Sequence, residues 1–140
     1  MRVSDIMTRA PVTISPAARA DEVAHLMREK GISSVILVTN GKPVGIVTER
    51  DLVHRVLALD KDPKKLMAAD ISTKPVIAIS IHSQVEDAVN TMHEHKIRRL
   101  VVLDDLDRVA GILTTDDVGY NLKSMSEELA VKYLSLTKRK

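Results

Sequence analysis

The two halves of the sequence repeat one another, and this duplication limits the possible folds more than any other feature. The stretch GIVTERDL, which begins at Gly45, recurs as GILTTDDV 66 positions later, at Gly111. Matches that lie earlier in the repeat, such as Met27 and Met92, are 65 positions apart. A repeat of this length indicates one structural unit built twice.

Both halves follow the same pattern of hydrophobic periodicity. Short β-prone stretches opened by proline, at residues 11–14 and 75–79, precede sets that share one helical face: Val23, Leu26, Met27 and Lys30, then Val85, Ala88, Val89 and Met92. Aliphatic runs at 34–38 and 99–103 lead through turns into a further strand, which predicts a hairpin in each half. A second helix is expected to begin near Glu49 and near Thr115. Each half is therefore a strand-helix-strand-strand-helix unit.

The expected domain organisation has three parts, which are repeat 1 at 1–60, repeat 2 at 66–121 and a C-terminal segment at 122–140. The linker ALDKDPKK, which contains Pro63, is charged, as an exposed connection should be. A unit of roughly 60 residues buries little surface alone, so the two copies are expected to share one core. In the last part, apolar residues recur at helical spacing and predict an amphipathic helix before the basic tail TKRK: Leu122, Met125, Leu129, Tyr133 and Leu136.

Composition excludes several classes of protein. The absence of cysteine rules out disulfides, thiolate zinc sites and cysteine nucleophiles. No apolar run approaches the ~20 residues of a membrane span and no signal peptide is present, so we expect a cytoplasmic protein without membrane contact. His93 and His95 point in different directions on a helix, and no phosphate-binding glycine loop or nucleophile elbow occurs. We therefore expect neither a metal site nor an enzyme.

The repeated Thr-x-x-Asp pattern has two interpretations. Thr48 and Asp51, like Thr114 and Asp117, have the spacing of a helix capping box. The same carboxylate can also accept two hydrogen bonds, as a ribose diol requires. The two interpretations do not exclude each other.

With these residues in view, the chain resembles a known family. The stretches KGISSVILVTNGKPVGIVTERDL and HKIRRLVVLDDLDRVAGILTTDDV look like a pair of CBS (cystathionine β-synthase) domains, and the resemblance extends to about residue 121. It implies an α/β (α+β) fold of tandem β-α-β-β-α repeats, packed through their sheets with pseudo-twofold symmetry, with the C-terminal helix added. Such a Bateman module has two clefts that commonly bind AMP, ADP, ATP or S-adenosylmethionine.

The resemblance also assigns residues to the two clefts. In this family the signature Asp holds the ribose, the Thr lies nearby, and apolar side chains pack against the base. The preferred cleft would contain Ile46, Thr48, Arg50, Asp51, Thr73, Val76, Ile97, Arg98 and Arg99. The second cleft would contain Thr8, Val12, Ile32, Ser33, Ile112, Thr114 and Asp117.

The signs of the neighbouring charges predict that the clefts differ. Arg98 and Arg99 stand where related proteins often place basic residues that meet phosphate, whereas the matching positions of the first repeat are serines. Arg50 precedes Asp51, whereas an acid precedes Asp117. The Asp51 cleft should therefore accept a phosphorylated ligand and the Asp117 cleft should resist one. A solvated helix end or surface ion pair is the alternative for the two arginines.

Three functions remain open. The first is an adenine-nucleotide-binding regulatory or energy-sensing module that transmits ligand occupancy to an unknown regulated protein, without a resident cofactor. The second is an adaptor or structural dimer with vestigial clefts. The third is a nucleic-acid binder that uses the basic tail. The resemblance implies a homodimer, and the C-terminal helix could serve the dimer, a partner or its own core.

Overall fold

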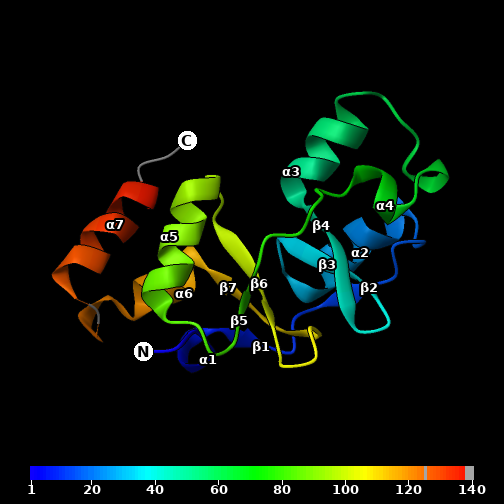
Figure 1. Ribbon diagram of the computed structural model, residues 1–140. Coiled ribbons are helices and arrows are strands. Elements are labelled where there is room, and N and C mark those ends of the chain that lie inside the picture. Colours follow the sequence, from blue (N-terminus) through cyan, green and yellow to red (C-terminus); the bar gives the residue numbers. More distant parts are fainter. Residues whose placement is uncertain (125, 138–140) are drawn as a thin grey trace. The chain divides into compact units, whose positions relative to one another are not determined.

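The structure, a computed structural model, describes residues 1–124 and 126–137. The chain divides into two compact units (Figure 1). Unit 1 comprises Met1–Ala10 together with Ile77–Lys140, and unit 2 comprises Pro11–Val76. The first ten residues thus fold with the second repeat, and the opening of the second repeat folds with the first.

Unit 2 is a three-stranded sheet with helices. Its strand order is β2-β3-β4, in which β2 and β3 are parallel and β3 and β4 form an antiparallel hairpin. The elements in chain order are β2 (Thr13–Ile14), α2 (Ala20–Lys30), β3 (Ser34–Thr39), β4 (Lys42–Thr48), α3 (Glu49–Leu52), a π-helical turn (Val53–Leu57), a 3-10 turn (Pro63–Lys65) and α4 (Ala68–Ile71).

Unit 1 repeats this plan with two additions, β1 and α7. Its four-stranded sheet has the order β1-β7-β6-β5, with β5 parallel to β6 and the other pairs antiparallel. The elements are α1 (Val3–Ile6), β1 (Thr8–Arg9), β5 (Ala78–Ser80), α5 (Val85–His95), β6 (Arg99–Leu103), β7 (Val109–Thr114), α6 (Thr115–Tyr120), a 3-10 turn (Leu122–Ser124) and α7 (Glu127–Thr137). The mixed α/β fold predicted from the sequence is confirmed.

Hydrophobic periodicity located the longer elements correctly. The predicted helical faces are buried at Val23 and Met27 in α2, and at Val85, Ala88, Val89 and Met92 in α5. Two aliphatic clusters form the cores, one in each unit. The first strands of the repeats are shorter than the predicted stretches, since β2 begins two residues after Pro11 and β5 begins three residues after Pro75.

The pair Asp5-Ile6 recurs 65 positions later as Asp70-Ile71, and its aspartates have a structural role that the sequence did not reveal. Asp5 accepts a hydrogen bond from the Arg2 backbone N–H at 2.7 Å, and Asp70 accepts one from Met67 at 2.8 Å. These bonds close the first turn of the four-residue helices α1 and α4. Such short helices lack the length from which periodicity is recognised.

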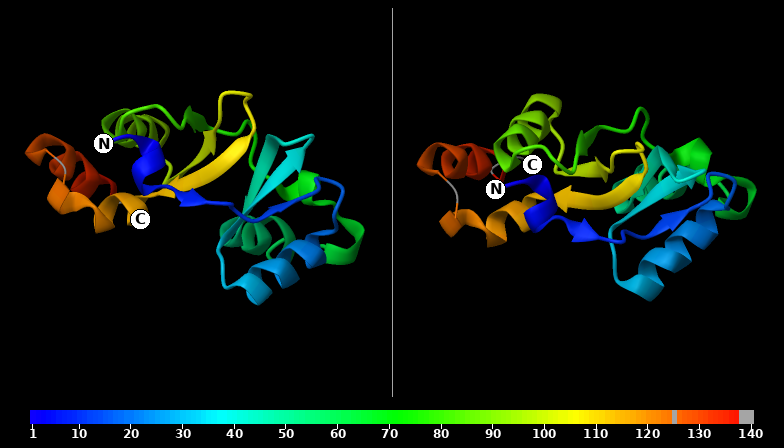
Figure 2. Two further views of the ribbon diagram at one scale, coloured as in Figure 1. Left: turned by 90° about the horizontal axis from the view of Figure 1, so that it is seen from below. Right: turned by 60° about the horizontal axis from the view of Figure 1, so that its bottom comes forward.

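The opening segment of each repeat pairs with a strand of the other repeat. In unit 1, β1 lies antiparallel to β7, with Thr8 opposite Ile112 (Figure 2). In unit 2, Thr73 forms an isolated antiparallel bridge with Ile46. Each unit therefore contains residues of both repeats.

The start of α2 is held by a charged fork. Arg19 Nε and Nη2 donate to Asp21 Oδ1 and Oδ2 at 2.9 and 3.3 Å. The hydrogen bond from Arg19 lowers the pKa of the Asp21 carboxyl.

The C-terminal helix packs on the core of unit 1. Leu129 and Leu136 are buried in that core, and α7 lies beside α5 (Figure 1). The Lys132 ammonium donates to Asn90 Oδ1 at 3.0 Å. Of the three roles considered for this helix, the structure shows packing against the core of its own chain. Met125, which was predicted to lie on the apolar face, and the basic residues 138–140 lie outside the described residues. None of the helices in the described ranges has the length and apolar character needed to cross a bilayer.

Candidate functional site

Asp51 lies at the first turn of α3 and is held there by the residue that begins the helix. Its Oδ2 accepts hydrogen bonds from the Thr48 N–H at 2.9 Å and the Thr48 hydroxyl at 3.2 Å. The Asp51 N–H donates back to the Thr48 hydroxyl at 3.3 Å. The capping box predicted from the spacing is therefore confirmed.

The other carboxylate oxygen of Asp51 meets a distant segment. The Thr73 hydroxyl donates to Asp51 Oδ1 at 3.3 Å, and Arg55 Nε lies 3.7 Å from the same oxygen. Thr73 arrives there because its backbone exchanges two hydrogen bonds with Ile46, of 2.9 and 3.3 Å. Only 7% of Asp51 is exposed. We call Thr48, Asp51, Arg55 and Thr73 the Asp51 site.

Unit 1 repeats this arrangement around Asp117. Asp117 Oδ2 accepts from the Thr114 N–H at 2.9 Å and from its hydroxyl at 3.1 Å. The Thr8 hydroxyl donates to Asp117 Oδ1 at 3.4 Å, since β1 lies beside β7. We call Thr8, Thr114 and Asp117 the Asp117 site. A helix cap alone would not bring a threonine from the other repeat to each carboxylate.

The glycine that opens each signature makes room for that distant segment. An ideal Cβ built at Gly45 would lie 2.8 Å from Ser72 Oγ, and one at Gly111 would lie 2.7 Å from the Thr8 carbonyl oxygen. Side chains at these two positions would push the segments away. The signature therefore combines a close approach, a helix cap and a carboxylate in seven consecutive positions.

This geometry suits a ligand that presents hydroxyl donors. One carboxylate oxygen is committed to the helix start, while the other retains acceptor capacity beside a threonine hydroxyl. A neutral diol can donate to such an oxygen without bringing in a charge that would need compensation. Both interpretations of Thr-x-x-Asp are therefore compatible at each position.

The remaining predicted site residues divide between the units. Ile46 and Val76 belong to unit 2, where Arg50 is exposed on α3, and Ile112 belongs to unit 1. The other residues predicted for the Asp51 cleft, Ile97, Arg98 and Arg99, belong to unit 1, and those predicted for the Asp117 cleft, Val12, Ile32 and Ser33, belong to unit 2. The contribution of these two groups stays a prediction.

Sequence reasoning missed Arg55. It named Arg98 as the phosphate partner of this cleft, with Arg99 and Arg50 as further partners, and these roles stay predictions. The structure places the Arg55 guanidinium beside the Asp51 carboxylate, one helical turn after Asp51. The signal available in the sequence was the i, i+4 spacing of an acid and a base on one helix face.

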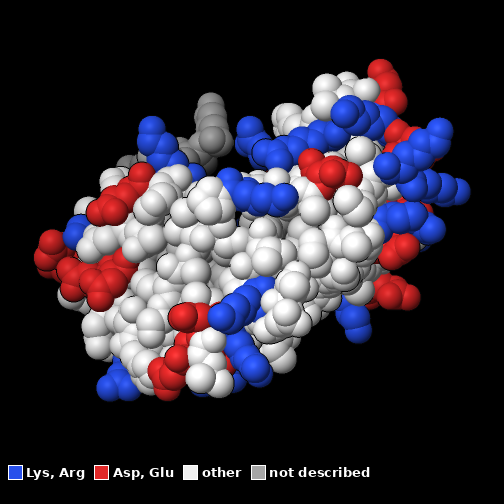
Figure 3. Space-filling view, turned by 45° about the vertical axis from the view of Figure 1, so that its right-hand side comes forward, with Lys and Arg blue, Asp and Glu red and all other residues white. Residues whose placement is uncertain are grey.

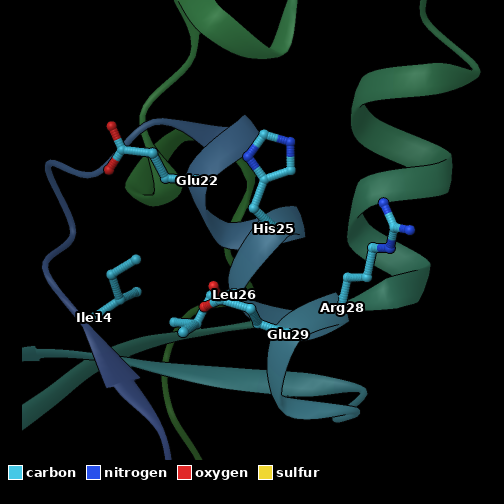
Figure 4. Close-up of a pocket in the computed structure, with 6 residues that line it drawn as sticks. All are labelled: Ile14, Glu22, His25, Leu26, Arg28 and Glu29. Atoms are coloured by element: carbon cyan, nitrogen blue, oxygen red, sulfur yellow. The ribbon is translucent and has the colours of Figure 1, made fainter.

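Two other features of the structure lie apart from the Asp51 and Asp117 residues. A pocket of about 610 Å³ lies along α2, and Figure 4 shows that its lining side chains come from that helix and from β2. The pocket is lined by Ile14, Glu22, His25, Leu26, Arg28 and Glu29. None of these residues was predicted to bind a ligand. Asp104 accepts from the N–H groups of Leu106 and Arg108 at 2.8 and 3.0 Å, which is a turn role. Within the described ranges no metal-ligating cluster of His, Asp and Glu was found.

The family model described as CBS domain matches residues 3–58 and 68–121. The chain belongs to the CBS domain family. Its signature residues thus occur in both domains of a CBS pair. An uncharacterised protein of Methanopyrus kandleri is 39% identical over 91% of this chain and 67% of its own length. Inosine-5′-monophosphate dehydrogenase of Korarchaeum cryptofilum is 32% identical over 85% of this chain, which spans 24% of that enzyme's length.

Solved structures of CBS domains resemble the whole pair. A CBS domain protein of Pyrobaculum aerophilum complexed with AMP has a TM-score of 0.79 and 25% identity, covering 96% of this chain and 99% of its own. A CBS domain pair in complex with 5′-methylthioadenosine and S-adenosyl-L-methionine has a TM-score of 0.78 and 28% identity, covering 89% and 97%. A hexameric CBS-CP12 protein from bloom-forming cyanobacteria has a TM-score of 0.79 and 27% identity, covering 91% and 76%.

Proposed function

We propose that this CBS pair is a regulatory module that binds adenosine-containing ligands at Asp51 and at Asp117. The observation that carries the proposal is the matched geometry of the two carboxylates. Each has one oxygen fixed by the helix cap and the other beside a threonine from the opposite repeat. Similar CBS structures hold AMP, 5′-methylthioadenosine and S-adenosyl-L-methionine, all of which carry a ribose.

The ligand of the Asp51 site is proposed to be AMP, ADP or ATP. The support is the sign of the predicted phosphate partners Arg98 and Arg99 and of Arg55 beside the carboxylate. The Asp117 site, with Asp116 next to its carboxylate, is proposed to take a ligand with less negative charge.

A route for signalling follows from the threonine contacts. A ribose that bonds Asp51 Oδ1 competes with the Thr73 hydroxyl, which belongs to the opening segment of the second repeat. The ligand therefore favours one arrangement of that segment over another, and a partner protein that reads the segment would respond to occupancy.

Isothermal titration with AMP, ATP and S-adenosylmethionine tests the proposal on the full chain. Asp51→Asn and Asp117→Asn keep the shape of the cap but remove the charge, and each should weaken binding at its own site by roughly tenfold or more. Glu49→Gln, an exposed change in the same turn as Asp51, is the control and should leave binding unchanged. Failure of the unaltered protein to bind any of these ligands would refute the proposal.

Self-association is a second proposal, supported by exposed apolar side chains in unit 2. Val53 is 48% exposed and Leu57 is 71% exposed, one turn apart on the same helix. Apolar surface of this kind is typical of contacts between proteins. Nucleic-acid binding has less support, because Figure 3 shows basic and acidic side chains interspersed over the face it displays.

A further inference from the structure

The two sites differ at one position that the signature does not include. Arg55 stands four residues after Asp51, and the matching position after Asp117 is Asn121. Arg55 Nε lies 3.7 Å from Asp51 Oδ1. Asn121 instead donates its side-chain N–H to the backbone carbonyl of Asp117 at 2.8 Å. This hydrogen bond is made to the backbone of Asp117 and not to its carboxylate.

Backbone bonds hold the Arg55 guanidinium in place. Its Nη1 donates to the carbonyl oxygens of Ser72 at 2.8 Å and Ile71 at 3.4 Å. These carbonyls directly precede Thr73, whose hydroxyl bonds the same carboxylate oxygen. The positive charge is therefore fixed beside Asp51 Oδ1, whereas a free surface arginine would sample many rotamers.

The helix that carries Arg55 also differs between the repeats. After α3 the chain widens into a π-helical turn, in which the Ala58 N–H donates to the Val53 carbonyl at 2.8 Å. In unit 1, α6 is a regular α-helix through Tyr120. The first repeat thus presents Arg55 from a backbone geometry that the second repeat does not share.

A carboxylate that holds a ribose also repels any phosphate on the same ligand. The ribose hydroxyls and the phosphate of a nucleoside monophosphate lie within one Debye length of each other, about 8 Å at physiological salt. The repulsion between the carboxylate and the phosphate is therefore only partly screened. A cation fixed on the carboxylate cancels much of the repulsion while leaving acceptor capacity for the hydroxyls. Uncharged Asn121 supplies no such cancellation at the Asp117 site.

We propose that Arg55 sets the charge preference of the Asp51 site and favours phosphorylated over unphosphorylated adenosine ligands. The inference rests on the proposed function, because it requires that Asp51 bind a ribose. It assigns specificity to a charged residue that lies outside the signature. Arg55 acts through the charge of Asp51.

The test measures AMP and adenosine by isothermal titration in full-length protein that carries Asp117→Asn, so that the Asp51 site is observed alone. Arg55→Gln should lower the preference for AMP over adenosine roughly fivefold, the upper range for a half-exposed ion pair. Arg55→Lys should restore that preference, because it retains the charge although it loses the planar fork. Lys61→Gln, which removes an exposed charge from the same unit, should leave the preference unchanged.

Salt and the reciprocal variant give independent readouts. Raising the salt concentration should increase the AMP preference of the Arg55→Gln protein, because salt screens the repulsion that Arg55 no longer cancels, and should change that of the unaltered Asp51 site less. In a background of Asp51→Asn, Asn121→Arg should increase the AMP preference of the Asp117 site.

Equal losses of AMP and adenosine affinity in Arg55→Gln, with no rescue by Arg55→Lys, would overturn the inference and leave Arg55 as a structural tether. That result would leave the proposed function intact. If the Asp117→Asn background binds neither ligand, the proposed function of the Asp51 site fails, and the inference fails with it.

Discussion

At the scale of single residues, the signature glycines show how closely the two repeats are fitted together. Gly45 and Gly111 lie where the opening segment of the opposite repeat passes over the strand. The obstacle to a side chain differs between them. At Gly45 it is the Ser72 hydroxyl, which can rotate, whereas at Gly111 it includes the Thr8 backbone carbonyl, which is held in a strand.

Alanine substitutions should reveal this difference. We expect Gly111→Ala to lower the free energy of unfolding by about 1–3 kcal/mol, the usual cost of overpacking, and Gly45→Ala to cost less. Adding Ser72→Ala to Gly45→Ala should recover part of the loss, because it removes the nearest atom. Urea denaturation provides the measurement, and equal losses at both glycines would contradict the argument.

At the scale of elements, α7 distinguishes the two repeats. An ideal Cβ at Gly119 would come too close to the Tyr133 hydroxyl, so the glycine gives the end of this α7 side chain room to pack on α6. The matching residue of the first repeat is Val53, which is exposed. The C-terminal helix is therefore complementary to the helices of unit 1.

Truncating the buried face of α7 should destabilise unit 1. Leu136 is 1% exposed, and Leu136→Ala is expected to cost about 2–5 kcal/mol of unfolding free energy. Leu134 lies on the same helix but is 50% exposed, so Leu134→Ala serves as the control and should cost much less. Urea denaturation followed by circular dichroism gives both values. Similar losses for the two variants would mean that α7 does not pack as described.

At the scale of the whole molecule, unit 2 has exposed apolar side chains on the helical turn that directly follows the Asp51 site. Leu57 and Val53 project from the helix that follows Asp51. A contact made there would connect the Asp51 site to a second protein through one short helix. This is the physical basis for the homodimer proposed above.

Leu57→Glu tests that assembly. A charge at the centre of an apolar contact should shift the protein toward monomer in size-exclusion chromatography with light scattering, since the buried carboxylate would lack a partner. Leu106 is 68% exposed in the turn between β6 and β7, and Leu106→Glu is the matched control. If the unaltered chain is already a monomer, or if Leu57→Glu leaves the oligomer intact, this surface is not the interface.

The sequence by itself determined the duplication, the longer helices and hairpins, and the two capping boxes. These features depend on neighbours within one turn or one strand pair, so periodicity and spacing reveal them. The same spacing predicted the signature carboxylates as ribose acceptors, and the resemblance to CBS domains added Thr73 and Thr8 to that prediction.

Only the tertiary structure decided that the opening segment of each repeat pairs with a strand of the other repeat. Thr8 and Asp117 are 109 positions apart, and no local pattern encodes their hydrogen bond. The same applies to the Arg55 guanidinium, whose partners Ile71 and Ser72 lie across a turn-rich linker. Pairing between segments far apart in the sequence depends on the packing of side chains in both cores, which local spacing does not describe. For that reason the sequence could name the carboxylates, but the fold had to show which side chains surround them.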